Sequence, residues 1–395
     1  MASIVETAPL VLDVGVVLLA AATSGLVARK VGLPAIVGYL LAGLLVSPFT
    51  PGFVANGDQL ALLADIGVVL LLFEVGIEID LRRIRNEHGA LLWASPLQVI
   101  AGTLLGTPVF LLLDIPLFGA ALLALSLAMS SSVVIVNITR SRRRTTSVAT
   151  EESLLGWSVL QDITGVTLAA LIIALLGSGS ESPIRAIFGL IGFIALAIVA
   201  SRVLPYLLRL VRWESDLFLI YSVAIGLSLA ALGTVLFGIP MALASFVAGL
   251  AINQTRDTDN VRKAVLPFKD LFQVLFFVVI GSLVQPALIL EALPFAGILL
   301  LLMFILKTLP AFLLSRYGKI GDSAGQLSIG LSQIGEFSFV LGSAALAAGE
   351  ITKVQFTGVL MAVIASIIFS TLAVRRASRI SRSLCADLTL KPESP

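Results

Sequence analysis

The chain has 395 residues, of which 58% are hydrophobic and 13% charged, and its formal net charge is only +2. A mean hydropathy of +1.06 excludes a soluble domain of any class. Apolar runs of about 17 residues or more recur along the whole chain, and each is long enough to cross the roughly 30 Å hydrocarbon core of a bilayer as a helix. The composition therefore predicts an all-α polytopic membrane protein.

The apolar runs divide the chain into thirteen expected transmembrane helices. The expected spans are 8–28, 34–47, 57–79, 90–113, 118–139, 149–176, 184–211, 215–237, 240–254, 261–284, 292–316, 321–348 and 353–377. The second and ninth spans are short.

Lys and Arg gather in the loops after the odd-numbered spans, as in the clusters at 82–85 and 140–144. The loops after the even-numbered spans contain only Arg185 and Lys353. Because basic loops stay on the cytoplasmic side, this asymmetry predicts an N-terminus outside and a cytoplasmic C-terminus. We expect a multi-pass protein of the cell (inner) membrane.

Two parts of the sequence repeat each other at an offset of about 205 residues. Gly32-Leu33-Pro34 opens the second span and leads to Ala42-Gly43-Leu44, while Gly238-Ile239-Pro240 opens the ninth and leads to Ala248-Gly249-Leu250. In the spans that follow, Asp65, Leu70 and Gly76 correspond to Asp270, Leu275 and Gly281. An odd number of spans separates the copies, so the second copy is inserted upside down. The pattern predicts two inverted-topology six-helix repeats, which are typical of a secondary transporter.

Transporters of this kind bind substrate between crossed discontinuous helices, whose unwound backbone must face protein or water. The fifth span contains Ser130, Ser131 and Ser132, and the twelfth contains the polar run 328–336. Serines are also common packing residues in membrane helices, so either run alone is a weak signal. Their matching positions in the two repeats predict that both helices are broken.

Asp162 lies near the middle of the apolar span 149–176, where the midplane of the bilayer is expected. A charged group at this depth costs roughly 2.5–3.5 kcal/mol on insertion scales, so it persists mainly where it serves a function. Neutralisation by a buried base for packing alone is the alternative. We interpret Asp162 as the principal functional residue.

Among the further ionisable residues within apolar spans, we single out Glu74, Lys307 and Glu336. Lys307 is too deep to reach the interface, so we expect Asp162 or Glu336 as its carboxylate partner, either in the ion site or as a permanent brace. Two interpretations of Glu336 are equally consistent with the sequence: it is a functional acid, or it stabilises the ends of the broken helices. Glu74 is two turns from a basic loop and also fits a side chain that reaches the cytoplasmic interface.

The chemistry of one buried acid suggests exchange. Burial in an apolar medium favours the neutral form of a carboxylic acid, and either a proton or a dehydrated monovalent cation neutralises its charge. Occupancy by one excludes the other. Competition for Asp162 therefore predicts coupled cation/proton exchange, with no other metal site and no cofactor.

The chain resembles the monovalent cation:proton antiporter-2 family, which contains Kef-type potassium/proton antiporters and related sodium/proton antiporters. The matching stretches span nearly the whole chain: Gly32-Leu33-Pro34 with 38–43, Leu72–Asp80, Ser130-Ser131-Ser132, Gln161-Asp162, Phe276–Gly281 and Gly335–Val340. The resemblance implies that Asp162 binds the cation or proton, with Gln161, Ser130, Ser131 and Ser132 beside it. It also implies that Lys307 and Glu336 are charge partners in the core, and we group Glu74 with them.

The resemblance further implies a homodimer with a scaffold and a moving core. The expected transmembrane antiporter domain covers 1–382, with scaffold and dimer helices at about 8–80 and 215–284, a linker helix at about 184–211, core helices at about 90–176 and 292–377, and a short cytoplasmic tail at 383–395. Kef-type proteins usually carry a C-terminal nucleotide-binding regulatory domain, which we expect to be absent from this chain.

These patterns predict a secondary active antiporter that exchanges K⁺ or Na⁺ for H⁺ by alternating access, with electroneutral stoichiometry because Gln161 does not ionise. A ligand-gated potassium efflux system resembling a channel is the alternative, although no filter-like loop of carbonyls is evident. An intramembrane protease needs a second catalytic group that the sequence does not supply. We expect that the protein is not an enzyme and binds no nucleic acid.

Overall fold

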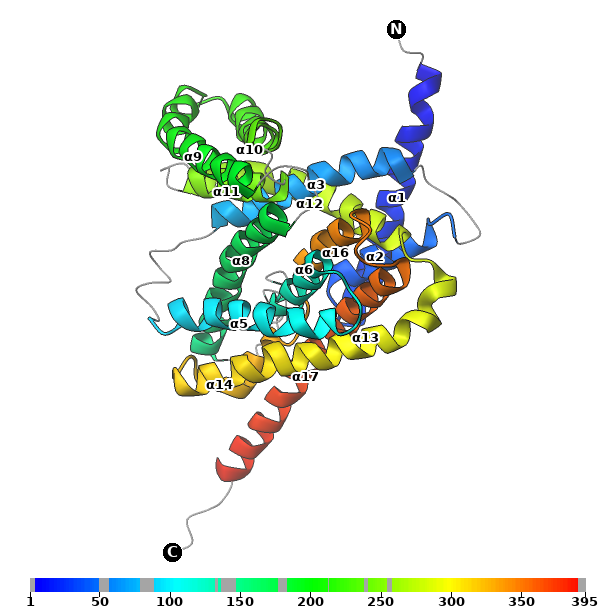
Figure 1. Cartoon of the computed structure of the whole chain (residues 1–395), viewed down its shortest axis with the longest axis vertical. Coiled ribbons are helices and arrows are strands. Elements are labelled where there is room, and N and C mark those ends of the chain that lie inside the picture. The colour runs from blue at the N-terminus through cyan, green and yellow to red at the C-terminus, as the bar shows by residue number, and fades with distance from the viewer. Residues whose placement is uncertain are drawn as a thin grey trace, which may run out of the picture. The chain divides into compact units, whose positions relative to one another are not determined.

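A computed structural model describes residues 4–49, 57–78, 89–131, 134–135, 147–176, 183–211, 213–237, 241–253 and 258–389. These residues are helical with short connections, and each of the predicted spans contains helix (Figure 1). Within the described part, nine helices are long and apolar enough to cross a membrane, and four shorter apolar helices accompany them. The agreement follows from the length and hydropathy of the spans.

The chain separates into two compact units, each built from two stretches of sequence. Unit 1 comprises Met1–Asp80 and Val166–Ala287, and unit 2 comprises Leu81–Gly165 and Leu288–Pro395. Helix α8 (Val148–Leu176) contributes its first part to unit 2 and its last part to unit 1. The assignment of scaffold and core roles remains a prediction.

Unit 1 contains seven further helices within its described residues. They are α1 (Ile4–Lys30), α2 (Ala35–Leu45), α3 (Gly57–Glu78), α9 (Pro183–Val211), α10 (Ser215–Phe237), α11 (Met241–Asn253) and α12 (Thr258–Ser282). Helix α9 packs against α10, and both contact α11. Side chains of α1 such as Val11 and Leu19 are 70% and 67% exposed, as expected of a surface that faces lipid.

The turn between α1 and α2 explains the Gly-Leu-Pro motif. Gly32 has a φ of +87°, a conformation that costs glycine little and other residues more. Its neighbour Leu33 donates its N–H to the carbonyl of Ala28 at 2.8 Å, which closes the end of α1. Pro34 follows with extended backbone and precedes the first turn of α2. The second motif of this kind, at 238–240, lies outside the described residues.

In unit 1, helices of the two predicted repeats pack crosswise: α2 against α12, and α3 against α11. Ser47 Oγ donates to the carbonyl of Ser282 at 2.9 Å, and Asn253 Nδ2 donates to the carbonyl of Ile77 at 2.5 Å. Ser47 corresponds to Asn253, and Ile77 to Ser282, at the offset of the sequence repeat. These paired contacts are those expected of two copies related by an approximate twofold axis.

Besides the first part of α8, the described residues of unit 2 form seven helices and one π-turn. They are α5 (Leu91–Leu111), α6 (Leu117–Ala128), α13 (Ile289–Met303), the π-turn η2 (Phe304–Thr308), α14 (Leu309–Tyr317), α15 (Ala324–Leu331), α16 (Phe337–Ala347) and α17 (Lys353–Thr389). A short 3₁₀ turn (Pro286–Leu288) joins the units. Both predicted breaks occur, after Ala128 and between Leu331 and Phe337.

The last helix differs from the prediction in length. Helix α17 continues to Thr389, beyond the expected end of the span at 377, so residues 383–389 of the expected tail are helical. No Gly or Pro occurs between Gly358 and Pro392, so the sequence offers no strong helix breaker in this region.

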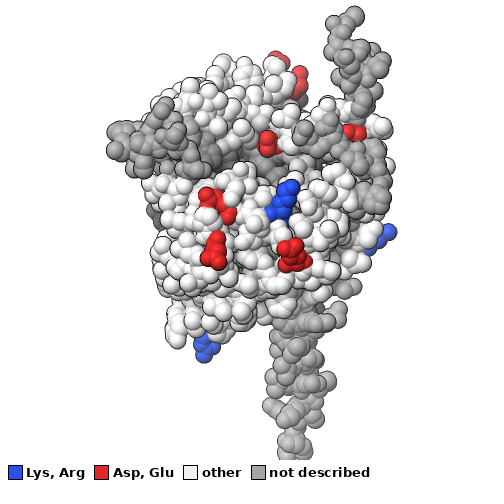
Figure 2. Space-filling model, turned by 45° about the vertical axis from the view of Figure 1, so that its right-hand side comes forward, with Lys and Arg blue, Asp and Glu red and all other residues white. Residues whose placement is uncertain are grey.

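Figure 2 shows one face of the molecule, on which charged side chains are isolated among uncharged ones.

Candidate functional site

The two broken helices of unit 2 meet at their breaks. Gly335 donates its N–H to the carbonyl of Met129 at 2.9 Å, and Ser130 Oγ donates to the carbonyl of Leu331 at 2.9 Å. A Cβ on Gly335 would lie 2.9 Å from the carbonyl carbon of Ser130, so only glycine permits this approach. Some of the backbone groups that lose their helical hydrogen bonds at one break therefore form hydrogen bonds with residues of the other break.

Lys307 binds both breaks at once. Its side chain is fully buried, and its Nζ donates to the carbonyl of Met129 at 2.9 Å and to the carbonyl of Gln333. Met129 follows α6 and Gln333 follows α15, so one ammonium group holds one carbonyl from each broken helix. We had expected a carboxylate partner; in the described part of the chain, both hydrogen bonds of Lys307 run to carbonyl oxygens. The π-turn η2 carries Lys307, and such turns are frequent at functional sites.

Gln161 on α8 caps the first break. Its Oε1 accepts from the N–H of Ser130 at 3.2 Å, and its Nε2 donates to the carbonyl of Ala128 at 3.3 Å. The same Nε2 donates to Gln98 Oε1 on α5 at 2.5 Å. Gln98 Nε2 donates in turn to the carbonyl of Ala128 at 3.2 Å. Two buried amides therefore replace the helical hydrogen bonds lost where α6 ends.

The second break has its own supports. Gln333 Nε2 donates to the carbonyls of Ser131 and Gly330, both at 3.2 Å. On α17, Ser366 Oγ accepts from the N–H of Ile334 at 2.9 Å. Ser366 thus does at the second break what Gln161 does at the first, by accepting from a freed backbone donor.

The two acids of unit 2 that the sequence analysis assigned to the core, Asp162 and Glu336, are both buried. Asp162 is 3% exposed and directly follows Gln161 on α8. Glu336 is 4% exposed and occupies the N-cap position of α16, where the helix dipole favours a negative charge. The structure therefore brings Gln161, Ser130, Ser131 and Lys307 into one hydrogen-bonded crossing. Asp162 and Glu336 are the sequence neighbours of two residues of this crossing, Gln161 and Gly335.

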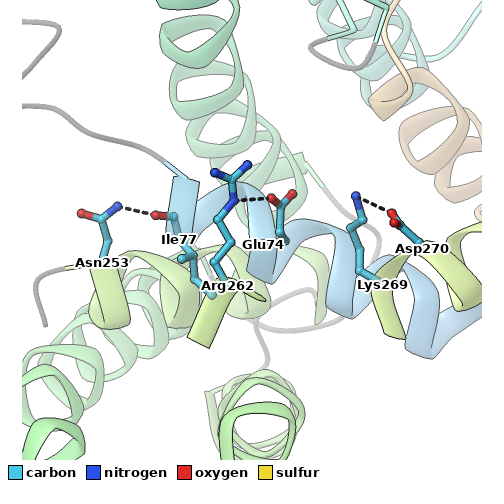
Figure 3. A network of polar contacts seen from close by, with 6 residues as sticks. All are labelled: Glu74, Ile77, Asn253, Arg262, Lys269 and Asp270. Carbon is cyan, nitrogen blue, oxygen red and sulfur yellow. Dashed lines mark hydrogen bonds and ion pairs between the residues drawn. The ribbon is translucent and has the colours of Figure 1, made fainter. Parts of the chain in front are cut away.

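Ser132 lies outside the described residues. Glu74 requires a correction, because it does not belong with the charges of the core. It lies in unit 1 and pairs with Arg262, whose Nε is 2.9 Å from Glu74 Oε1 (Figure 3). Only 7% of the Glu74 side chain is exposed, so most of it is covered by protein. The basic partner comes from α12, about 190 residues later in the chain, which local sequence gives no means to see.

Three buried polar residues of this crossing were missed by the sequence analysis: Gln98, Gln333 as a hydrogen-bonding side chain, and Ser366. Each is an uncharged polar residue within an apolar span. That pattern was a usable signal, because a buried amide in a bilayer must find a partner.

The arrangement supplies the groups that a small monovalent cation requires. Carboxylate, hydroxyl and carbonyl oxygens replace water around such ions, and discontinuous helices present them at depth. Asp162 and Glu336 add two buried carboxylic acids, and a carboxylic acid can bind either a cation or a proton. The groups present are therefore of the kinds that ion binding requires.

Comparison with known proteins agrees with this architecture. Residues 16–378 match the family described as "Sodium/hydrogen exchanger, transmembrane". A relative in Escherichia coli (strain K12), described as "Putative cation/proton antiporter YbaL", is 30% identical over 367 residues, which cover 88% of this chain and 64% of that protein. The chain thus spans somewhat less than two thirds of the length of this relative.

The fold also matches a solved structure, that of the sodium proton antiporter MjNhaP1 from Methanocaldococcus jannaschii at pH 8. The TM-score is 0.73 and the match covers 94% of this chain and 98% of the other, at 17% sequence identity. This similarity concerns the fold. Since the family model covers most of the chain and the described residues form apolar helices throughout, the protein is a multi-pass membrane protein of the sodium/hydrogen exchanger family.

Proposed function

We propose that this chain is a secondary active antiporter that exchanges K⁺ or Na⁺ for H⁺ by alternating access, and that it is not an enzyme. The observation that carries the proposal is Asp162, a carboxylic acid buried in a membrane-spanning helix beside the crossing of two broken helices. Family membership and the shared antiporter fold support the same function.

The geometry accounts for coupling through one acid. Gln161 is uncharged and its amide is bonded to backbone and to Gln98, so Asp162 is the ionisable member of the pair. A cation or a proton neutralises Asp162, and the site crosses the membrane when it is neutral. Ser130 and Ser131 contribute oxygens at the break, with Ser132 next to them in the sequence.

Lys307 and Glu336 retain their charges through the cycle in this scheme, and exchange is therefore one-for-one and electroneutral. Lys307 holds the two breaks together by its bonds to Met129 and Gln333. Glu336 stabilises the start of α16 through the helix dipole.

The setting of the protein belongs to the same proposal. We infer an inner-membrane homodimer with its N-terminus outside and its C-terminus in the cytoplasm. The distribution of Lys and Arg among the loops supports the orientation. Cross-linking of a detergent-free membrane preparation and labelling of single cysteines placed at each terminus test these two points.

The decisive experiment uses the purified protein in proteoliposomes with an internal pH dye. We expect addition of K⁺ or Na⁺ to discharge an imposed pH gradient, with saturable dependence on the cation. Runs with potassium, sodium and lithium give the selectivity. A ligand-gated potassium efflux channel would instead carry K⁺ without dissipating the pH gradient when the membrane potential is clamped, and that result would reject antiport.

A further inference from the structure

Gln98 has no role in the ion exchange described so far, yet it is among the most buried polar residues of unit 2. It lies on α5 and is 1% exposed, and Gln161 on α8 is fully buried. The distance of 2.5 Å between Gln161 Nε2 and Gln98 Oε1 joins the two amides directly. Such a pair in an apolar interior is costly unless every polar atom has a partner.

The hydrogen-bond partners leave each amide one orientation. Gln161 Oε1 faces the N–H of Ser130, a donor, and its Nε2 faces the carbonyl of Ala128, an acceptor. Gln98 Nε2 also faces the carbonyl of Ala128. Flipping either amide would set donor against donor or acceptor against acceptor. The sequence of bonds from Ser130 through Gln161 and Gln98 to Ala128 therefore has a fixed direction.

This chain of bonds keeps the Gln161 oxygen occupied. An amide oxygen is a good ligand for a dehydrated cation, and Gln161 adjoins Asp162, so an unrestrained Gln161 would compete for the ion. Gln98 accepts one of the two Nε2 hydrogens of Gln161 and thereby holds the oxygen toward Ser130.

We propose that Gln98 is a positioning residue for ion exchange: it fixes the Gln161 amide against the break after α6, so that Asp162 rather than the Gln161 oxygen determines cation affinity. This inference rests on the proposed antiport function. It predicts that Gln98 affects the apparent KM and the choice among cations more than the maximal rate.

The first test compares Gln98→Leu with wild type and with Thr103→Val in proteoliposomes. Thr103 lies on the same helix, is also buried, and donates only to the carbonyl of Val99 one turn earlier, so its hydroxyl is a matched control. We expect Gln98→Leu to change the KM for K⁺ or Na⁺ by about threefold or more and to alter their ratio, as loss of the buried hydrogen bond that holds Gln161 implies. Thr103→Val should retain the wild-type values.

The second test uses Gln98→Glu, which introduces a carboxyl group whose ability to donate a hydrogen bond depends on pH. A protonated Glu accepts from Gln161 Nε2 and donates its O–H to the carbonyl of Ala128, as Gln does; an ionised Glu cannot donate. The KM of this variant should equal that of wild type at low pH and diverge from it as pH rises. Wild type is measured at every pH, because Asp162, Glu336 and Lys307 of the same unit contribute a pH dependence of their own.

The outcomes separate this inference from the function on which it rests. Lack of exchange by wild type overturns both. Exchange by wild type, with unchanged KM and selectivity in Gln98→Leu, overturns only the role of Gln98. If Gln98→Leu does not fold, Gln98→Glu decides, and a ratio of its KM to that of wild type that is constant across pH rejects the inference.

Discussion

Gly43 of α2 and Gly281 of α12 lie with backbone against backbone. A Cβ on Gly43 would be 2.9 Å from Gly281 Cα, and a Cβ on Gly281 would be 2.2 Å from the carbonyl oxygen of Leu40. Gly76 and Gly249, their counterparts in the repeat, make the same contact between α3 and α11: a Cβ on Gly249 would be 2.8 Å from Gly76 Cα. The contact occurs twice because each copy of the repeat supplies one glycine to each crossing.

Gly281→Ala is expected to destabilise unit 1. The added methyl meets a backbone oxygen that cannot move without shifting α2, and overpacking of this kind costs about 1–3 kcal/mol or more. The melting temperature in detergent measures the effect. Gly15→Ala is the control, since nothing lies within 4 Å of its Cβ. Equal melting temperatures for the two variants would contradict the proposed tight crossing.

Asp162→Asn is expected to fold and insert but to lose exchange for every cation. Asparagine preserves the shape of the side chain and removes the charge that cation and proton share. Cation-induced discharge of a pH gradient in proteoliposomes checks this. Asp216→Asn, which alters an exposed acid in the first turn of α10, should transport normally. Robust exchange by the Asp162 variant would refute the shared-site mechanism.

Lys307→Met should lower stability and shift the pH dependence of transport. The substitution leaves the buried carbonyl of Gln333 without the Lys307 donor, at about 1–3 kcal/mol for a stranded group, whereas the carbonyl of Met129 keeps the N–H of Gly335. Thermal melting and a pH series of transport rates measure the two effects. Lys353→Met removes an exposed lysine at the start of α17 and should change neither. A wild-type melting temperature and pH profile in the Lys307 variant would mean that Lys307 neither braces the breaks nor influences the site.

Ser366→Ala tests the support of the second break. Ile334 loses the acceptor for its buried N–H, and the expected loss of stability is about 1–3 kcal/mol. Ser343→Ala is matched in chemistry, because Ser343 Oγ only donates to the carbonyl of Val340 in its own helix. We expect a clear fall in melting temperature for Ser366→Ala alone, and indistinguishable variants would show that the cap contributes nothing.

Electroneutral exchange predicts independence from voltage. With Gln161 uncharged, one cation or one proton neutralises the pair, so no net charge moves per cycle. A potential of about 100 mV contributes about 2.3 kcal/mol per charge moved. The reversal point of transport, measured in liposomes whose potential is set by an untransported ion, should stay constant. A shift with voltage would indicate a second titrating group.

The fold was largely predictable because its main determinant is local. Long apolar spans predict helices whatever their neighbours are, and the expected ends of the span at 215–237 agree with those of α10. The breaks were predictable as well, since Ser130 and Ser131 stand where a continuous apolar helix has no need of hydroxyls.

The partners of individual side chains were less predictable. The sequence predicts a carboxylate partner for Lys307, but carbonyls freed by helix breaks are also strong acceptors. The sequence does not show which carbonyls these are. Arg262 as the partner of Glu74, and Gln98 as the partner of Gln161, depend on contacts between distant helices. The assignment of Asp162 and its neighbours to ion binding remains a prediction for the experiments above.

The π-turn at Phe304–Thr308 determines which way the two ends of one long helix face. A π-turn holds one residue more than an α-turn, so the side chains beyond Thr308 are rotated by about 100° from the direction that α13 alone would give them. Helix α13 packs on α17, whereas Ala311 of α14 packs with Leu327 and Leu331 of α15. Deleting one residue from this turn would realign both faces and rotate Ala311 away from α15. The angular register of a single turn thus decides whether one helix can serve two different neighbours.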